Sequence, residues 1–316
     1  MAKNWIQMQK GLSFNVFIST YGTEMQCEAA VEKSKWPQGF RCLKCGCDHS
    51  YVYRKKTVKV FQCRACRKQV TLTEGTIFQS TKLSLIQWFQ AMYLMTQNKN
   101  NVSILELKRH IGIGYKSAWG LKHKLMQVMY ERETTTMLSG RVEVDDAYLG
   151  GELRGGKSGR GSENKVPFVA AVQTDKHNHP IYAVFSQVKA FTLDEIRNWA
   201  RNSLVPETIV VSDGLNCFPS VEDVGCFHQR IIVGNDQKSV DMECFSWVNT
   251  ILGNLKTAFA GTYHAFDFKK YGYRYLGEVQ YRFNRRFDLA TMLPRLIYAA
   301  ANTECRTERL LRFAEA

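Results

Sequence analysis

The feature that most constrains this chain is a pair of Cys-x-x-Cys motifs separated by seventeen residues. Two such pairs at this separation can place four thiolates around one ion, which suits a closed structural Zn²⁺ site. Short runs of β-forming residues lie between the pairs, on either side of a basic turn at residues 54–56. We therefore predict a zinc ribbon that holds one zinc ion per chain through Cys42, Cys45, Cys63 and Cys66. Cys47 could compete as a ligand, but its spacing from Cys45 fits the paired turns less well.

The charge of the chain favours a polyanionic partner. The formal net charge is +14, and the basic segment from His49 to Thr73 contains no acidic residue. Such a balance is typical of proteins that bind nucleic acid, although a basic run can also be a solvated face. The remaining cysteines show no second paired spacing, and the first residues lack a cationic segment followed by an apolar run. We therefore expect a cytoplasmic protein without a membrane anchor.

Three helices are predicted after the ribbon. Apolar residues at helical spacing mark the first over residues 83–95, and Ser103 with Glu106 forms a capping box that begins the second. Glycines at 112 and 114 separate the second from a third helix over 115–131. Two short helices around a glycine turn, the later one basic, suggest a helix-turn-helix that reads DNA, and a plain helical hairpin is the alternative. The outward cations expected on the third helix are Lys116, Lys122 and Lys124.

The second half of the chain predicts an α/β domain. Strands are expected over 141–149, 166–174 and 181–188, and then a helix over 192–203. A strand over 208–213, another over 226–233 and helices through most of 243–259 and beyond follow. Three antiparallel strands, a helix, a strand, a helix and a strand is the order of a ribonuclease-H-like fold with a mixed sheet.

Two acids lie where such a sheet would bring them together. Strand alternation turns Val142 and Val144 to the core, so that Glu143 and Asp145 share the other face. Asp213 ends the later strand just before a glycine, and acids at strand ends beside a glycine turn are common ligands in open α/β sheets. If the two strands are neighbours, Asp145 and Asp213 converge on one metal. Asp146 points to the other face and is interpreted as structural.

A later helix adds an amide and an ammonium. An apolar stripe along residues 248–259 predicts a buried helix face, while Asn249 and Lys256, seven residues apart, lie together on another face.

These motifs in their order resemble the bacterial insertion-sequence transposases that carry an N-terminal zinc ribbon and an Asp-Asp-Asn/Glu catalytic domain. The resemblance extends from about residue 40 to residue 287 and rests on Glu143-Val-Asp-Asp146, Gly150-Gly151, Ser212-Asp213-Gly214, Trp247-Val248-Asn249 with Lys256, Gly261-Thr-Tyr-His-Ala265 and Tyr281-Arg-Phe-Asn-Arg-Arg286. Asn249 departs from the triad of three acids. In this subgroup it is a familiar variant, so the resemblance implies an active enzyme.

The resemblance implies a metal-dependent DNA transposase. Asp145, Asp213 and Asn249 would hold two Mg²⁺ or Mn²⁺ ions roughly 3.5–4 Å apart, and Lys256 would hold a phosphate. Water would first free a 3′-OH at the element end, and that 3′-OH would then attack target DNA. The expected partners are terminal inverted repeats, target DNA and further copies of the chain. Phosphate contacts are expected from Arg54, Lys55 and Lys56 on the ribbon and from Arg282, Arg285 and Arg286 on a late helix.

The predicted organisation is an N-terminal segment (1–36), a zinc ribbon (37–76), a helix-turn-helix region (77–135), a catalytic domain (138–302) and a C-terminal tail (303–316). The glycine- and lysine-rich segment 150–165 is interpreted as a mobile basic loop that closes on DNA. Two alternatives stay open: a DNA-binding regulator that has lost catalysis at Asn249, and another nuclease of the same fold, such as a structure-specific resolving enzyme.

Overall fold

The structure is a computed structural model that describes residues 5–151, 156, 162–231, 243–263 and 266–313. Contacts between Cα atoms divide the chain into two compact units, the first formed by residues 1–128 and 287–313 and the second by residues 129–286. Among the described residues, no helix is both long and apolar enough to cross a membrane.

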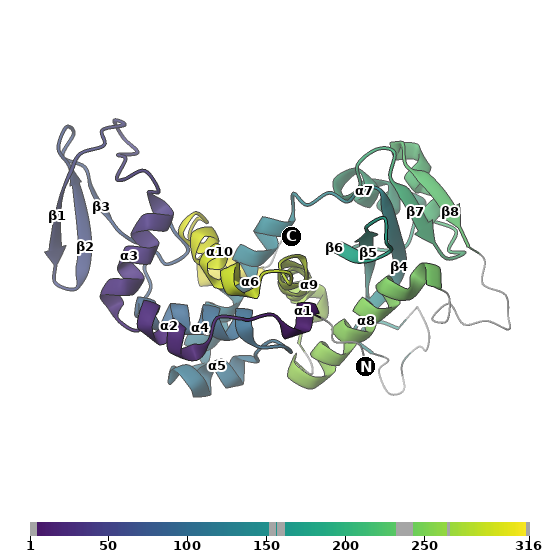
Figure 1. Cartoon of the computed structure of the whole chain (residues 1–316), viewed down its shortest axis with the longest axis horizontal. Helices are drawn as coiled ribbons and strands as arrows, with labels where there is room; N and C mark the ends of the chain where they lie inside the picture. Colours follow the sequence, from purple (N-terminus) through teal and green to yellow (C-terminus); the bar gives the residue numbers. More distant parts are fainter. Residues whose placement is uncertain (1–4, 152–155, 157–161, 232–242, 264–265, 314–316) are drawn as a thin grey trace. The chain divides into compact units, whose positions relative to one another are not determined.

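The first unit consists of a small antiparallel sheet and several helices (Figure 1). Its sheet has the strand order β1-β2-β3, which confirms the predicted ribbon. In chain order the elements are α1 (Trp5–Met8), α2 (Phe14–Tyr21), α3 (Glu24–Lys35), β1 (Ser50–Lys55), β2 (Val58–Cys63), β3 (Gln69–Thr71), α4 (Leu85–Gln97), α5 (Ile104–Ile111), α6 (Tyr115–Glu133), α10 (Leu289–Ala301) and α11 (Glu308–Phe313). The end of α6, from residue 129, belongs to the second unit.

The helices after the ribbon begin where the sequence places them. Ser103 caps α5 through a capping box with Glu106, and Gly112 ends α5 in the left-handed conformation, at a φ of 71°. The predicted boundary of the catalytic domain at residue 302 differs from the structure. Helix α10 packs against α3 and α4 in the first unit, because an apolar stripe shows that a helix is buried but not which core it joins.

Helix α6 does not present the basic face that was predicted for it. Lys122 is fully buried, and its ammonium donates a hydrogen bond to the carbonyl oxygen of Val102 at 2.5 Å. Lys124 is partly buried and donates to the carbonyl oxygen of Ile77 at 3.4 Å. Of the three predicted cations only Lys116 is exposed, 3.5 Å from Glu308. The other two satisfy buried carbonyl groups, so their expected contacts with DNA are not compatible with their positions.

The second unit is built around a mixed five-stranded sheet of order β6-β5-β4-β7-β8. Strands β4, β5 and β6 are antiparallel neighbours, whereas β7 and β8 run parallel to β4, which confirms the ribonuclease-H-like arrangement. The elements are β4 (Arg141–Leu149), β5 (Val166–Thr174), β6 (Pro180–Gln187), α7 (Leu193–Ser203), β7 (Ile209–Ser212), η2 (Phe218–Val224), β8 (Phe227–Arg230), η4 (Glu243–Phe245), α8 (Ser246–Ala258), η5 (Phe259–Tyr263) and α9 (Phe268–Asn284).

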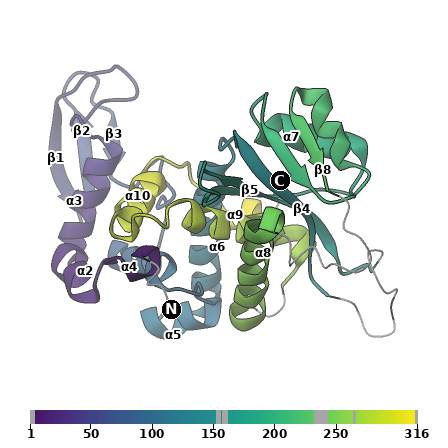
Figure 2. The same cartoon turned by 45° about the vertical axis from the view of Figure 1, so that its right-hand side comes forward.

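The two faces of this sheet pack against different helices (Figures 1 and 2). Val142 and Val144 of β4 pack into a core with Ile196 and Trp199 of α7 and with the segment η2. Alternation turns Glu143 to the opposite face, where its carboxylate meets the start of α8. The predicted inward and outward faces of β4 are therefore correct.

Side-chain amides of α9 cover the outer edge of β6. Asn284 accepts a hydrogen bond from the N–H of Ala183 at 2.8 Å and donates one to the carbonyl oxygen of the same residue at 3.1 Å. Gln280 accepts a hydrogen bond from the N–H of Phe185 at 3.0 Å. These two amides take the place that a further strand would occupy.

Candidate active site and zinc site

The carboxylates of Asp145, Asp146 and Asp213 form one cluster in the second unit. A carboxylate oxygen from each lies within 4.8 Å of the others, and all three residues are partly buried. Strands β4 and β7 pair in parallel up to Val144 and Ser212, so that Asp145 and Asp213 are the next residues of two adjacent strands. The predicted convergence of these two acids is therefore present in the structure.

Asp146 joins the cluster, although strand alternation suggested that it points away. The pairing of β4 with β7 ends at Val144, so Asp145 and Asp146 lie beyond the last residue of the neighbouring strand. Beyond that point only β5 flanks β4, and Asp146 lies in the cluster although alternation alone would turn its side chain to the other face. The adjacent pair Asp145-Asp146, just past the last residue of β4 that pairs with β7, is the sequence feature that accompanies this cluster.

The cluster raises the pKa of Asp145. Burial, and then the negative charges of Asp146 and Asp213, raise the pKa of Asp145 from 3.8 to about 7, while the Lys256 ammonium opposes the rise. Several carboxylates held this close repel one another unless a cation or a proton lies between them. Hard oxygen donors in this arrangement fit a divalent ion such as Mg²⁺ or Mn²⁺.

Helix α8 carries the other two predicted residues. Its buried stripe is Val248, Ile251, Leu252 and Leu255, as predicted, so Asn249 and Lys256 lie on another side of the helix. Lys256 is exposed and acts electrostatically on Asp145, which places its charge near the cluster. Asn249 is partly buried, and its role as a metal ligand stays a prediction.

Glu143 attaches α8 to β4, a role that no sequence pattern indicated. Its fully buried carboxylate accepts hydrogen bonds from the backbone N–H groups of Trp247 and Val248, each at 3.0 Å. A carboxylate is favoured at a helix N-terminus by the unpaired amides and the helix dipole. Arg141 donates to the same carboxylate at 3.0 Å and balances its charge. Glu143 lies two residues before Asp145 in β4. It thus fixes the helix that bears Asn249 beside the strand that bears Asp145.

We expect Glu143→Gln to loosen this attachment. The amide would keep the volume but lose the charge, so Arg141 would lose its ionic partner and keep only neutral acceptors, which should cost about 1–3 kcal/mol of unfolding free energy. Denaturant unfolding of the full chain measures the loss, and divalent-ion affinity should fall with it. Glu195→Gln is the matched control, because Glu195 is partly exposed and its carboxylate accepts the N–H of Lys189 without an ion pair among the described residues. Equal stability of the two variants would contradict this role.

The pKa of Asp145 also predicts how ion binding depends on pH. A pKa raised to about 7 means that the folded, ion-free protein favours the protonated acid below that pH, so its stability falls as pH rises from about 4 through 7. A divalent ion must displace this proton, and its affinity should rise about tenfold per pH unit up to pH 7 and then level off. Mn²⁺ titration followed by paramagnetic resonance measures this. Asp213→Asn should shift the midpoint to lower pH, and a pH-independent affinity in the unaltered protein would contradict the assignment.

The four cysteines of the ribbon fit a zinc site. Their sulfur atoms all lie within 4.8 Å of one another, with 3.6 Å between Cys42 and Cys66 and 3.5 Å between Cys45 and Cys63. Tetrahedral zinc with bonds of about 2.3 Å would separate its sulfur ligands by about 3.8 Å. Backbone N–H groups of Cys66 and Ala65 help to lower the pKa of Cys63 to about 6, which favours the thiolate that zinc requires. Cys47 lies outside the four and contacts the carbonyl oxygen of His49.

The late basic helix holds the second unit together instead of presenting its arginines as phosphate clamps. Arg285 pairs with the buried carboxylate of Glu133 and lies 3.7 Å above the Tyr281 ring. Arg286 donates to the carbonyl oxygens of Pro180 and Ile181, and burial lowers its pKa to about 10. Burial likewise lowers the pKa of Arg282. Their expected role in binding DNA is therefore not compatible with the structure.

Of the cations predicted to bind DNA from the ribbon, one is paired with an acid and two are exposed. Arg54 forms an ion pair with Glu28, a mostly buried acid of α3, with 3.0 Å between Nη1 and Oε1. Lys55 and Lys56 are exposed at the hairpin between β1 and β2 and stay available. The predicted basic loop at 150–165 lies largely outside the described residues, as do residues 264–265.

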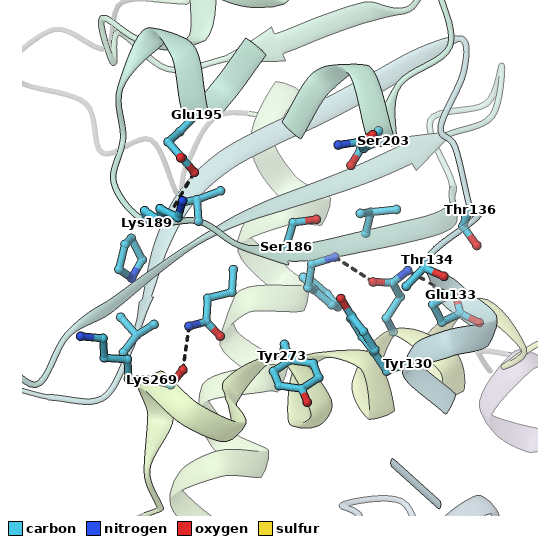
Figure 3. Close-up of a pocket in the computed structure, with 18 of the residues that line it drawn as sticks. Tyr130, Glu133, Thr134, Thr136, Ser186, Lys189, Glu195, Ser203, Lys269 and Tyr273 are labelled. Atoms are coloured by element: carbon cyan, nitrogen blue, oxygen red, sulfur yellow. Dashed lines mark hydrogen bonds between the residues drawn. The ribbon is translucent and has the colours of Figure 1, made fainter. Parts of the chain in front are cut away.

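A cavity of about 810 Å³ lies at the β6 edge of the second unit, away from the acids (Figure 3). Tyr130 and Tyr273 lie along it with their rings nearly perpendicular, at a centroid distance of 4.8 Å. Lys189 and Lys269 contribute to the same wall. None of the clustered aspartates lines this cavity.

A mixed sheet of this order, with acids of central strand β4 beside an acid that follows the adjacent strand β7, defines the ribonuclease-H-like class, and the acidic cluster fits a DDE-type site. Residues 137–284 match the ISXO2-like transposase domain, and residues 22–69 match the transposase zinc-ribbon domain. The chain therefore belongs to the insertion-sequence transposases that join an N-terminal zinc ribbon to a DDE domain. It is also similar to a Halobacterium salinarum protein described as an uncharacterized protein in transposable element ISH50. The two are 26% identical over 242 residues, which are 71% of this chain and 79% of that protein.

Proposed function

We propose that this chain is an active transposase that cleaves the 3′ ends of its element and joins them to target DNA. The observation that carries the proposal is the acidic cluster, in which two carboxylates of β4 and one that follows β7 converge. Substrate DNA would be the terminal inverted repeats and the target, bound by an assembly of several copies. The proposed place of action is the cytoplasm, on the DNA that carries the element.

Asp145 and Asp213 would hold the catalytic ions, and Asn249 would supply a third oxygen. When bound, two Mg²⁺ or Mn²⁺ ions would polarise the attacking and leaving oxygens of an in-line displacement. Lys256 would hold a substrate phosphate, because its exposed ammonium acts on Asp145 and is free to form a charge-assisted contact. Glu143 would keep α8 in register with the cluster.

Purified full-length protein with labelled element ends and a plasmid target tests the proposal. We expect a free 3′-OH at the element end in Mg²⁺ or Mn²⁺, followed by covalent joining of that end to the plasmid. Binding without cleavage in either ion would support the regulator that has lost catalysis. Cleavage without joining would support a nuclease that only hydrolyses DNA.

A further inference from the structure

The two zinc turns of the ribbon have the same backbone hydrogen bonds. In each turn, the N–H of the first cysteine donates to the carbonyl of the residue five positions later, at 2.9 Å in both. The N–H of the residue four positions later donates back to the carbonyl of Cys42 at 2.8 Å and of Cys63 at 3.1 Å. That fourth position is Gly46 in one turn and Arg67 in the other. Both adopt the left-handed conformation, with φ of 74° and 60°.

Arginine is an unfavourable residue at this position. Glycine adopts the left-handed conformation freely, whereas a residue with a Cβ atom is strained there. The equivalent turn shows that glycine fits the zinc site, so the site itself does not require the arginine side chain. Strain that persists where a simple substitution would remove it indicates a functional side chain.

The side chain of Arg67 shares an aromatic ring with a second arginine. The guanidinium carbon of Arg64 lies 4.7 Å from the centre of the Tyr51 ring, and that of Arg67 lies 6.0 Å from it. Half of the Tyr51 surface is exposed, and both arginines are exposed. We call these three residues the zinc-end surface.

The two arginines of the zinc-end surface differ from Arg54 and Lys59 in having no acidic partner among the described residues. Arg54 and Lys59 pair with Glu28 and Glu32 of α3. Within the described part of the chain, the interactions of Arg64 and Arg67 are with the Tyr51 ring, and no carboxylate lies within ion-pair distance of either. A cation–π contact with an aromatic ring restricts the freedom of the guanidinium group, which lowers the entropic cost of a paired contact.

We propose that the zinc-end surface reads sequence at the element end, through guanine in the major groove. This inference rests on the proposed function, because it assumes that the chain binds its own ends. The partner is DNA since the guanidinium groups held beside Tyr51 can pair with the O6 and N7 acceptors of guanine, and a β-ribbon fits the width of the major groove. The absence of acids between His49 and Thr73 favours a polyanion over a protein surface. Lys122 in the middle of α6 is buried, so it cannot contact DNA bases in place of the zinc-end surface.

The test compares affinity for a selected duplex with affinity for random duplex. A pool of randomised duplexes is enriched on the zinc-loaded full-length protein, and the ratio of the two affinities gives the discrimination. We expect Arg67→Gly and Tyr51→Ala each to lower this ratio about tenfold, as for the loss of one paired base contact. Tyr51→Phe should retain the ratio, because the ring still supports both arginines. Zinc content should stay at the wild-type level, and Arg67→Gly should not weaken zinc binding.

Lys56→Gly is the matched control. Lys56 also has a left-handed backbone, with φ of 57°, and it carries the same charge at the opposite end of the hairpin. Its replacement should weaken binding to both duplexes equally and leave the ratio unchanged. An equal fall in both affinities for Arg67→Gly would overturn sequence reading by this surface, while DNA binding would stand. If the wild-type protein enriches no sequence and cleaves no end, the proposed function itself fails.

Discussion

Replacing Asp213 with alanine is expected to abolish cleavage and strand transfer while binding of the element end stays nearly unchanged. The variant loses one charged oxygen donor of the acidic cluster. It keeps every cation that could bind DNA phosphates. The rate should fall by on the order of 10³ or more, since the transition state would lose the stabilisation that depends on this ligand. Asp145→Ala should behave in the same way. Gel-based cleavage assays and binding titrations on the same duplex measure the two effects separately.

Asp194→Asn is the control for these variants. Asp194 is an acid of the same unit, highly exposed on α7, where it pairs with Arg197. Its replacement should leave the cleavage rate unchanged. Retention of more than a few per cent of cleavage by Asp213→Ala would exclude this residue as a metal ligand.

The third oxygen ligand can be assigned in the same assay. Asn249→Ala should be nearly as severe as the aspartate variants, whereas Asn249→Asp should retain activity because it keeps an oxygen donor at this position. Asp146 is the rival, since the structure brings its carboxylate into the cluster. Wild-type rates in Asn249→Ala together with a large loss in Asp146→Ala would move the third ligand to Asp146.

Cys63→Ser is expected to remove zinc and unfold the ribbon locally. The free energy of zinc binding in such modules, about 10–16 kcal/mol, is largely the free energy that folds them. Zinc per chain should fall from one to near zero, and binding of the element end should be lost. Backbone amides of β1 and β2 should lose protection from hydrogen exchange, whereas those of the five-stranded sheet in the other compact unit should keep it.

Cys47→Ser provides the comparison, because its sulfur lies next to the ribbon cluster but outside it. This variant should keep its zinc and bind DNA normally. A zinc-free Cys63→Ser protein that still binds its ends with full affinity would show that the ribbon does not contribute to recognition.

Backbone elements were predictable here because their signals are local. Strand β4 begins and ends at the predicted residues, and its two valines face the predicted core. The convergence of Asp145 and Asp213 followed from the same logic, since the order of elements fixed which strands are neighbours. Ser103 likewise marked the start of α5 through contacts within one helical turn.

The partners of long polar side chains were not predictable in this way. Lys122 and Arg285 read as surface cations, yet one satisfies a buried carbonyl and the other pairs with Glu133, which lies far away in the sequence. Their positive charge gave no information about this, because a buried cation and a solvated one have the same sequence signature. Only the tertiary structure shows which acceptors their length can reach.

The amides of Asn284 and Gln280 on the rim of β6 have a consequence for how the protein folds. An uncovered strand edge can pair with another chain. In this protein the residues that cover the β6 edge belong to α9, about a hundred residues later in the sequence. During synthesis the five strands are complete before α9 has emerged, so the rim stays open for that interval. Chains truncated before α9 should therefore aggregate. The motif Tyr281-Arg-Phe-Asn-Arg-Arg286 would then help to keep the newly made chain soluble, because its Asn284 covers the β6 edge.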